Sequence, residues 1–335
     1  MLKNNIVRIV LVIIVLIIAS ITISNLFKLN NYKNATESIS DDDKEKYKNH
    51  FVMIYDSMDY KNWEHIYESA NAYAMEHDAY IELLSESLPT DYTKEEMLEL
   101  AIYADVDGII IEGDSSERIK TLIYEAENKG IPVVTVFTDS MGSGRSSFVG
   151  ISNYDVGYML ANEAIQNLKT SSTKNVMVLM DNSNEYSGQL MMYQAMLESF
   201  MGRNIKASEV TVENNSEFGM DESIRNILVN MEKEPDIMIC LSEELTESVY
   251  QELVEHNKAG SIDVMGLSSA ESSYKAVNKG RIKSLVSVDK EMMGINCAKA
   301  LVEYVYTGYV SEYFMVDVTL VTKENVLEYL GNEEE

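Results

Sequence analysis

The feature that most constrains the fold is a regular alternation of short apolar runs with longer stretches of helical periodicity, which begins near His50. Few of the apolar runs alternate with polar residues, which is typical of strands covered by helices on both faces. Helical stretches between such strands are the signature of βα units and parallel sheets. The sequence therefore predicts an α/β fold, and the expected strands are 51–56, 80–84, 108–113, 132–137, 175–181, 205–212, 236–242, 262–268 and 282–288.

Turn and cap residues agree with this pattern around one predicted helix. Asp114 and Glu117 resemble a capping box at its start. Gly130 suits the position after its last turn, where a left-handed backbone is common. Pro132 then stands just before the next strand, where proline ends a helix and is tolerated.

The N-terminus predicts a membrane anchor. The run from Ile6 to Phe27 is nearly unbroken after Arg8 and is close to the roughly 20 residues that span a bilayer. No A-x-A motif follows it and no cysteine lies near it, so we expect residues 1–28 to form an uncleaved single-pass anchor in the cell membrane. A cleaved signal peptide is the alternative. The polar segment 29–49 is expected to be a flexible tether to a domain outside the cytoplasm.

Charge excludes one class of partner. The chain has 335 residues, with 27 Lys+Arg against 55 Asp+Glu and a net charge of −28. Such a surface repels phosphate backbones, so we expect no nucleic-acid partner.

Signatures of catalysis and of metal binding are missing from the sequence. The cysteines, Cys240 and Cys297, are expected to be small buried hydrophobes. The four histidines form no HxxxH or HExxH group, so a zinc site is not expected. The glycine-serine stretch 142–147 matches neither a P-loop nor a dinucleotide-binding turn. We therefore expect neither a cofactor nor an enzyme activity.

Polar residues end several of the predicted strands. In parallel α/β sheets, ligands bind beyond the carboxyl ends of the strands, so a ring of polar groups there predicts a binding cleft. The alternative is that each polar end only marks a loop or a helix cap. The strand ends concerned are Asp56-Ser57, Glu112, Thr138-Asp139, Asp181-Asn182, Ser242-Glu243, Ser268-Ser269 and Asp289.

Two long stretches resemble the type I periplasmic sugar-binding proteins, of the ribose- and galactose-binding kind. The first holds the "DGIII" of Asp107–Ile111, the "GIPVV" of Gly130–Val134, Asp139, and the "FVGISNYDVG" of Phe148–Gly157. The second runs from Pro235 to Gly308. The same fold forms the ligand domain of lac-repressor-type regulators, but here a membrane span stands where those proteins carry a DNA-binding motif.

The resemblance implies two Rossmann-like lobes with crossed hinge connections. Lobe 1 is expected to hold about 50–151 and 288–309, and lobe 2 about 152–287 and 310–331. The hinges are expected near Gly150–Asn153, Ser287–Asp289 and Tyr309–Ser311.

The resemblance also implies a set of ligand-binding residues, although several polar positions depart from the sugar-binding pattern. Ser140 stands where ribose binders carry arginine, Ser242-Glu243 replaces an Asn-Asp pair, and Ser268 replaces an aspartate. Trp63 is expected to stack on a sugar ring, or else to pack in the core. Asp139 is expected to bind sugar hydroxyls, or else to cap a loop or form a salt bridge within a lobe. The full expected set is Asp59, Trp63, Asp139, Ser140, Tyr186, Gln189, Ser242, Glu243, Ser268 and Asp289.

These expectations describe a membrane-anchored, extracytoplasmic solute-binding protein. It would clamp a small ligand, a sugar by resemblance, between its lobes and present it to the membrane permease of an ABC-type importer. The alternative is a ligand-sensing subunit that works with a membrane sensor kinase.

Overall fold

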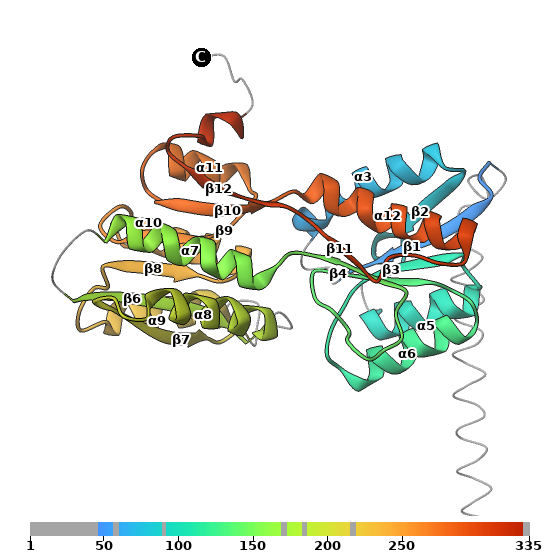
Figure 1. The fold of residues 1–335 in the computed structure, drawn as a ribbon, viewed down its shortest axis with the longest axis horizontal. Helices are drawn as coiled ribbons and strands as arrows, with labels where there is room; N and C mark the ends of the chain where they lie inside the picture. Colours follow the sequence, from blue (N-terminus) through green and yellow to red (C-terminus); the bar gives the residue numbers. More distant parts are fainter. Residues whose placement is uncertain are drawn as a thin grey trace, which may run out of the picture.

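The computed structural model describes residues 46–55, 60–88, 92–168, 173–182, 186–214 and 219–330, which form two lobes lying side by side (Figure 1). The predicted anchor over 1–28 and almost all of the tether lie outside these ranges. Within them, no helix combines the length and the apolar character needed to cross a bilayer.

The first lobe is built on a six-stranded sheet in the order β11-β5-β4-β3-β1-β2, and every strand pair in it is parallel. Neighbouring residues of β1 point to opposite faces, as the period of a strand requires. Phe51 and Met53 join the core under α3 and α12, whereas Val52 and Ile54 join the core under α5 and α6. The elements of this lobe are β1 (Asn49–Ile54), α3 (Tyr60–Glu76), β2 (Ala79–Leu83), α4 (Leu84–Ser87), α5 (Lys94–Ala104), β3 (Gly108–Glu112), α6 (Glu117–Asn128), β4 (Val133–Val136), β5 (Ser147–Gly150), α12 (Lys290–Thr307) and β11 (Tyr313–Met315).

The second lobe repeats this plan with the strand order β12-β10-β9-β8-β6-β7, in which only the β10–β12 pair is antiparallel. Val178 and Met180 of β6 pack under α7 and α8, whereas Leu179 packs under α9 and α10. The elements of this lobe are α7 (Asn153–Asn167), β6 (Lys174–Asp181), α8 (Tyr186–Phe200), β7 (Ile205–Val212), α9 (Gly219–Asn230), β8 (Ile237–Cys240), α10 (Glu243–Glu255), β9 (Asp263–Leu267), α11 (Glu271–Asn278), β10 (Ser284–Val288), β12 (Val318–Thr322) and the 3₁₀ turn η2 (Val326–Glu328).

The chain crosses between the lobes at the ends of β5, β10 and β11. The Val316 N–H donates to the Gly150 carbonyl at 2.8 Å, so two of the crossings lie beside each other. The last crossing differs from the expected one near 309–311. Strand β11 extends the first sheet by pairing with β5, so residues up to Met315 belong with lobe 1 and the crossing falls at Val316–Asp317.

All the strands expected from the apolar runs are present, whereas β5, β11 and β12 were not expected. Strands β5 and β11 have only four and three residues, and β12 alternates in burial because it is an edge strand. Strands that are this short, or that alternate between exposed and buried residues, contain no long apolar run by which the sequence could predict them.

A helix pair in each lobe is packed closely enough to require glycine. A Cβ on Gly294 of α12 would lie 2.2 Å from the Ile66 carbonyl oxygen of α3, and a Cβ on Gly157 of α7 would lie 2.2 Å from the Met192 carbonyl oxygen of α8. Backbone atoms cannot move aside as a flexible side chain can, so these glycines set the helix spacing in both lobes.

The predicted capping box before α6 is wrong. Ser116 is the N-cap, and its hydroxyl accepts from the Ile119 N–H. Asp114 lies too early, and its carboxylate instead accepts from the Ser116 N–H at 2.8 Å. The expected helix end is confirmed, since Gly130 has a φ of +83°.

Candidate functional site

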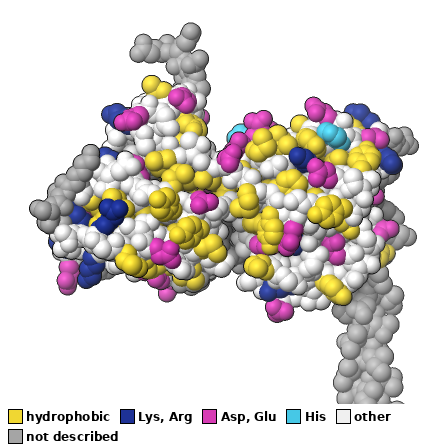
Figure 2. Space-filling view, in the orientation of Figure 1, with side chains coloured by type: hydrophobic (Ala, Val, Ile, Leu, Met, Phe, Trp, Pro, Cys, Tyr) yellow, Lys and Arg dark blue, Asp and Glu magenta, His cyan; other side chains and the backbone are white. Residues whose placement is uncertain are grey.

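The carboxyl edges of both sheets border the boundary between the lobes. The chain leaves the first sheet at the carboxyl end of β5 to enter α7, and it leaves the second sheet at the carboxyl end of β10 to enter α12. The surface also narrows between the lobes (Figure 2). Since ligands of such sheets bind beyond the carboxyl ends of strands, this boundary is the candidate site.

An aromatic cluster follows the ends of β1 and β4 in the first lobe. The Trp63 indole stacks on Tyr55 with ring centres 5.3 Å apart, and it meets Phe137 edge-to-face at 5.4 Å. Phe137 has a φ of +62°, a backbone conformation that is strained for a bulky residue. Such strain persists where the surrounding structure enforces it, and it is frequent at ligand sites. Sequence analysis missed Tyr55 and Phe137 because both look like strand residues.

Trp63 packs in the core of the first lobe, which was the alternative to stacking on a sugar ring. Its side chain is 1% exposed and belongs to the core beneath α3 and α12. Its indole N–H has no hydrogen-bond partner among the described residues, which is uncommon for a buried tryptophan. A stacking role toward a ligand remains a prediction.

Asp139 is held inside the first lobe by Arg145. The guanidinium donates to both carboxylate oxygens, from Nε at 2.5 Å and from its terminal nitrogen at 2.6 Å. The two side chains are only 17% and 6% exposed, and Arg145 also donates to the Glu312 carbonyl and lies over the Tyr313 ring. Burial alone would lower the pKa of Arg145, but Asp139 outweighs it and holds that pKa above its usual value. The alternative of a salt bridge within a lobe therefore describes Asp139 better than a carboxylate free for ligand hydroxyls.

Ser140 is fully buried and joins the loop after β4 to the loop after β3. Its hydroxyl donates to the Asp114 carbonyl at 2.9 Å and accepts from the Asp114 N–H at 3.0 Å. The Asp114 carboxylate lies 3.0 Å from the Lys94 ammonium. Burial alone would raise the pKa of Asp114, but the hydrogen bonds from Ser116 and the Lys94 charge outweigh it, so the pKa lies below its usual value.

The lowered pKa of Asp114 predicts an acid-sensitive contribution to stability. A carboxylate of this kind stabilises the fold fully above its unfolded pKa of about 3.9, and the contribution is lost as pH falls through the lower folded value. Asp114→Asn should therefore be less stable than the parent at pH 7, and the difference should shrink near pH 3. Urea unfolding at both pH values measures this. Glu117→Gln, at a side chain that is 91% exposed, is the control and should change little. A difference that widens at low pH would contradict the assignment.

Two residues of the expected ligand set, Ser242 and Gln189, form a buried network with Asp181 at the carboxyl ends of strands in the second lobe. The Ser242 hydroxyl donates to the Asp181 carboxylate at 2.6 Å, and the Gln189 amide donates to its other oxygen at 3.0 Å. Gln189 also accepts from the Asp181 N–H. Ser242 is the N-cap of α10 as well. These contacts fix the ends of β6 and β8 relative to α8 and α10.

Glu243 joins the second lobe to the first residue of α12. One carboxylate oxygen lies 2.7 Å from the Lys290 ammonium, and the other lies 3.3 Å from the Ser269 hydroxyl. Ser268 is fully buried and lies 3.3 Å from a Glu247 carboxylate oxygen. Sequence analysis missed Lys290, because nothing in the chain pattern pairs it with a residue 47 positions earlier.

The remaining expected residues divide into two groups. Asp289 is exposed and is the N-cap of α12, accepting from the Met292 N–H at 2.9 Å. Asp59 lies outside the described residues, and Tyr186 is the first residue of α8 with its side chain not described.

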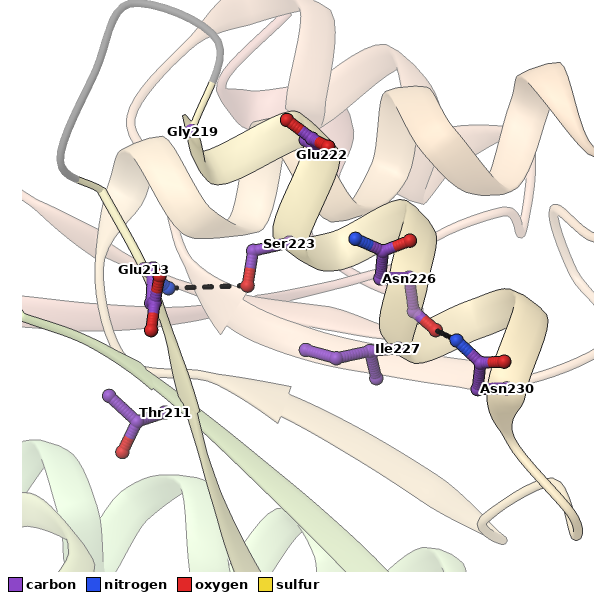
Figure 3. A pocket seen from close by; sticks show the side chains of 8 residues that line it. All are labelled: Thr211, Glu213, Gly219, Glu222, Ser223, Asn226, Ile227 and Asn230. Atoms are coloured by element: carbon purple, nitrogen blue, oxygen red, sulfur yellow. Dashed lines mark hydrogen bonds between the residues drawn. The ribbon is translucent and has the colours of Figure 1, made fainter.

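A cavity of about 710 Å³ lies elsewhere, on the second lobe (Figure 3). All of its lining belongs to β7, α9 and the connection between them, so it draws nothing from the first lobe. Its walls include Glu213, Ser223 and Asn226, and the Glu213 N–H donates to the Ser223 hydroxyl at 3.2 Å. Within the described ranges, no group of three histidine, cysteine or carboxylate side chains could hold a metal ion.

Comparison with known proteins identifies the family. The model of the periplasmic binding protein domain matches residues 51–308. The chain belongs to the periplasmic binding protein family. The resemblance seen in the sequence is thereby confirmed, and so is the fold of two parallel-sheet lobes. No curated protein matches the sequence.

Solved structures similar to this periplasmic binding protein share its fold at low sequence identity. A glucose-galactose binding protein, GanP of Geobacillus stearothermophilus, is 22% identical, with a TM-score of 0.71, over 84% of this chain and 99% of that one. A solute-binding protein of an ABC transporter from Bacillus halodurans C-125, solved with bound myo-inositol, is 18% identical, with a TM-score of 0.71, over 85% and 98%. XylFII in the XylFII-LytSN complex is 21% identical, with a TM-score of 0.70, over 83% and 98%.

Proposed function

We propose that this protein binds a small sugar or sugar-like polyol between its two lobes, outside the cytoplasm, and delivers it to an ABC-type importer. Binding rather than catalysis is the whole of the proposed activity. The lobes close around the ligand, and a membrane partner recognises the closed form.

The observation that carries the proposal is the position of the aromatic and polar strand ends. The cluster of Tyr55, Trp63 and Phe137 follows the carboxyl ends of β1 and β4 in the first lobe, and Phe137 is its partly exposed member. Ser242 and Glu243 border the lobe boundary from the second lobe. A sugar needs both kinds of surface, an aromatic face for its C–H groups and polar groups for its hydroxyls. Proteins of this fold include a glucose-galactose binder and a myo-inositol binder.

A thermal-shift screen with D-glucose, D-galactose and myo-inositol tests this proposal. A ligand at one hundred times its dissociation constant should add about 2.7 kcal/mol to the free energy of unfolding. Sucrose at the same concentration controls for the general effect of osmolytes. No specific shift with these compounds or with a wider panel of sugars and polyols would overturn the proposed ligand class.

We also propose that residues 1–28 anchor the mature protein in the cell membrane as a single-pass helix. The support is the apolar run from Ile6 to Phe27 with no A-x-A motif after it. Intact mass measurement of the mature protein tests it, since a chain beginning beyond Phe27 would indicate a cleaved signal peptide instead.

A sensing role is the second candidate. Its support is that XylFII, a protein of this fold, is found in a complex with a second protein, LytSN. In that role, the ligand-bound domain would act on a membrane sensor kinase. The neighbouring genes separate the two roles, because a permease and an ATPase favour import and a histidine kinase favours sensing.

A further inference from the structure

The ion pair between Lys290 and Glu243 connects the two lobes. The ammonium nitrogen and the carboxylate oxygen are 2.7 Å apart, and the side chains are 10% and 18% exposed. Lys290 is the first residue of α12, which packs against α3 in the first lobe. Glu243 is the first residue of α10, which packs on the sheet of the second lobe.

A third residue links this pair to the crossing at the end of β10. The Ser269 hydroxyl is 3.3 Å from the second oxygen of Glu243, and it accepts from the Val288 N–H at 3.0 Å. Val288 is the last residue of β10 and precedes the Asp289 cap of α12. Glu243 therefore contacts Lys290 directly and is linked to Val288 through Ser269, so it is connected to both sides of the crossing.

Lys290 occupies a position that a lysine does not favour by itself. The first turn of a helix carries positive partial charge, which disfavours a cation there. A largely buried ammonium also loses hydration and needs an anionic partner. Glu243 supplies this partner from the other lobe, so moving the lobes apart at this point would separate a desolvated pair.

We propose that the Lys290–Glu243 pair is a tie between the lobes that shifts the ligand-free protein toward the lobe arrangement described here. Lys290 is then a positioning residue for ligand capture, and it acts through Glu243 and not through the ligand. The inference deepens the proposed function and rests on it for its biological meaning. A tie that favours one lobe arrangement changes the apparent ligand affinity by the fraction of molecules that are competent to bind.

Distance measurement in the ligand-free, full-length protein tests the tie. Spin labels are placed by Glu117→Cys in the first lobe and Met201→Cys in the second, at side chains 91% and 78% exposed. The native Cys240 and Cys297 are buried, and burial raises the pKa of both thiols, so they should not take the label. Electron–electron double resonance then gives the distribution of distances between the lobes. Lys290→Met is expected to lower the ratio of molecules in the described lobe arrangement to molecules in other arrangements about tenfold, the equivalent of about 1.4 kcal/mol.

Two further variants make the result specific. Lys94→Met removes an ion pair of similar burial that lies wholly within the first lobe, at 3.0 Å from Asp114. It should lower stability and leave the distance distribution unchanged. The exchange Lys290→Glu with Glu243→Lys should restore part of the population in the described arrangement. Glu243→Gln provides the same comparison should Lys290→Met not fold.

An unchanged distribution in both Lys290→Met and Glu243→Gln would overturn the proposal, since the pair would then be packing only. The measurement uses no ligand, so its outcome is independent of the sugar screen. A distribution that changes in both variants while no sugar binds would support the tie and contradict the proposed function.

Discussion

Replacing Asp139 with alanine is expected to lower the free energy of unfolding by about 3–5 kcal/mol, the usual cost of leaving one member of a buried ion pair unpaired. Arg145 would keep its charge with a side chain only 6% exposed. It would also remain hydrogen-bonded to the carbonyl of Glu312, the residue just before the edge strand β11. Urea unfolding followed by circular dichroism measures the loss.

The double variant Asp139→Ala with Arg145→Met is the matched control. It removes the buried charge together with its partner, so it should recover much of the stability lost in Asp139→Ala. Equal stability of the single and double variants would contradict an ion pair as the cause. Affinity for any sugar found by the screen should change little in the double variant. A loss of tenfold or more there, with stability largely recovered, would restore Asp139 to the ligand site.

Trp63→Ala is expected to cost a similar amount, about 3–5 kcal/mol, because it leaves a large cavity in the core of the first lobe. The indole fills the space between Tyr55 and Phe137 under α3 and α12. Phe137 would also lose the ring that helps to hold its positive φ. Thermal or urea unfolding of the ligand-free protein measures this effect.

Trp63→Phe separates packing from recognition. It keeps an aromatic ring and removes the indole N–H, which has no partner among the described residues. The volume lost is smaller, and an unsatisfied polar group is lost with it, so stability should fall far less than in Trp63→Ala. Unchanged sugar affinity would identify Trp63 as core only, and a tenfold loss would identify the N–H as a ligand donor.

Most strands of both lobes could be predicted, because each of them is an apolar run next to a stretch of helical periodicity. Gly108–Glu112 is an example. The residues of this strand are apolar on both faces, and all but the last of them are buried. The family resemblance then supplied the crossed connections. The position of the last crossing could not be predicted, because β11 is held by pairing with β5 rather than by any pattern within its three residues.

The polar strand ends could be located from sequence, but their partners could not. Asp139 was expected at a strand end and lies there, yet its nearest charge is Arg145, in a glycine-serine stretch that looked only like a turn. Lys290 and Glu243 are 47 residues apart and meet only through the assembled lobes. Side-chain pairing across the fold depends on tertiary geometry, which periodicity and spacing do not contain.

The place of α12 in the chain has a consequence for the newly made protein. Its residues Cys297 and Leu301 cover the face of α3 that carries Ile66 and Ala70, but α12 begins at Lys290 and α3 at Tyr60. At about 5–20 residues per second, the ribosome makes the covering helix roughly 10 to 50 seconds after the helix that it covers. During that interval the first lobe has an uncovered apolar face and lacks its edge strand. The first lobe, although it comes first in the sequence, should therefore stay sensitive to protease until synthesis is nearly complete, and a holding chaperone should bind its uncovered face during that interval.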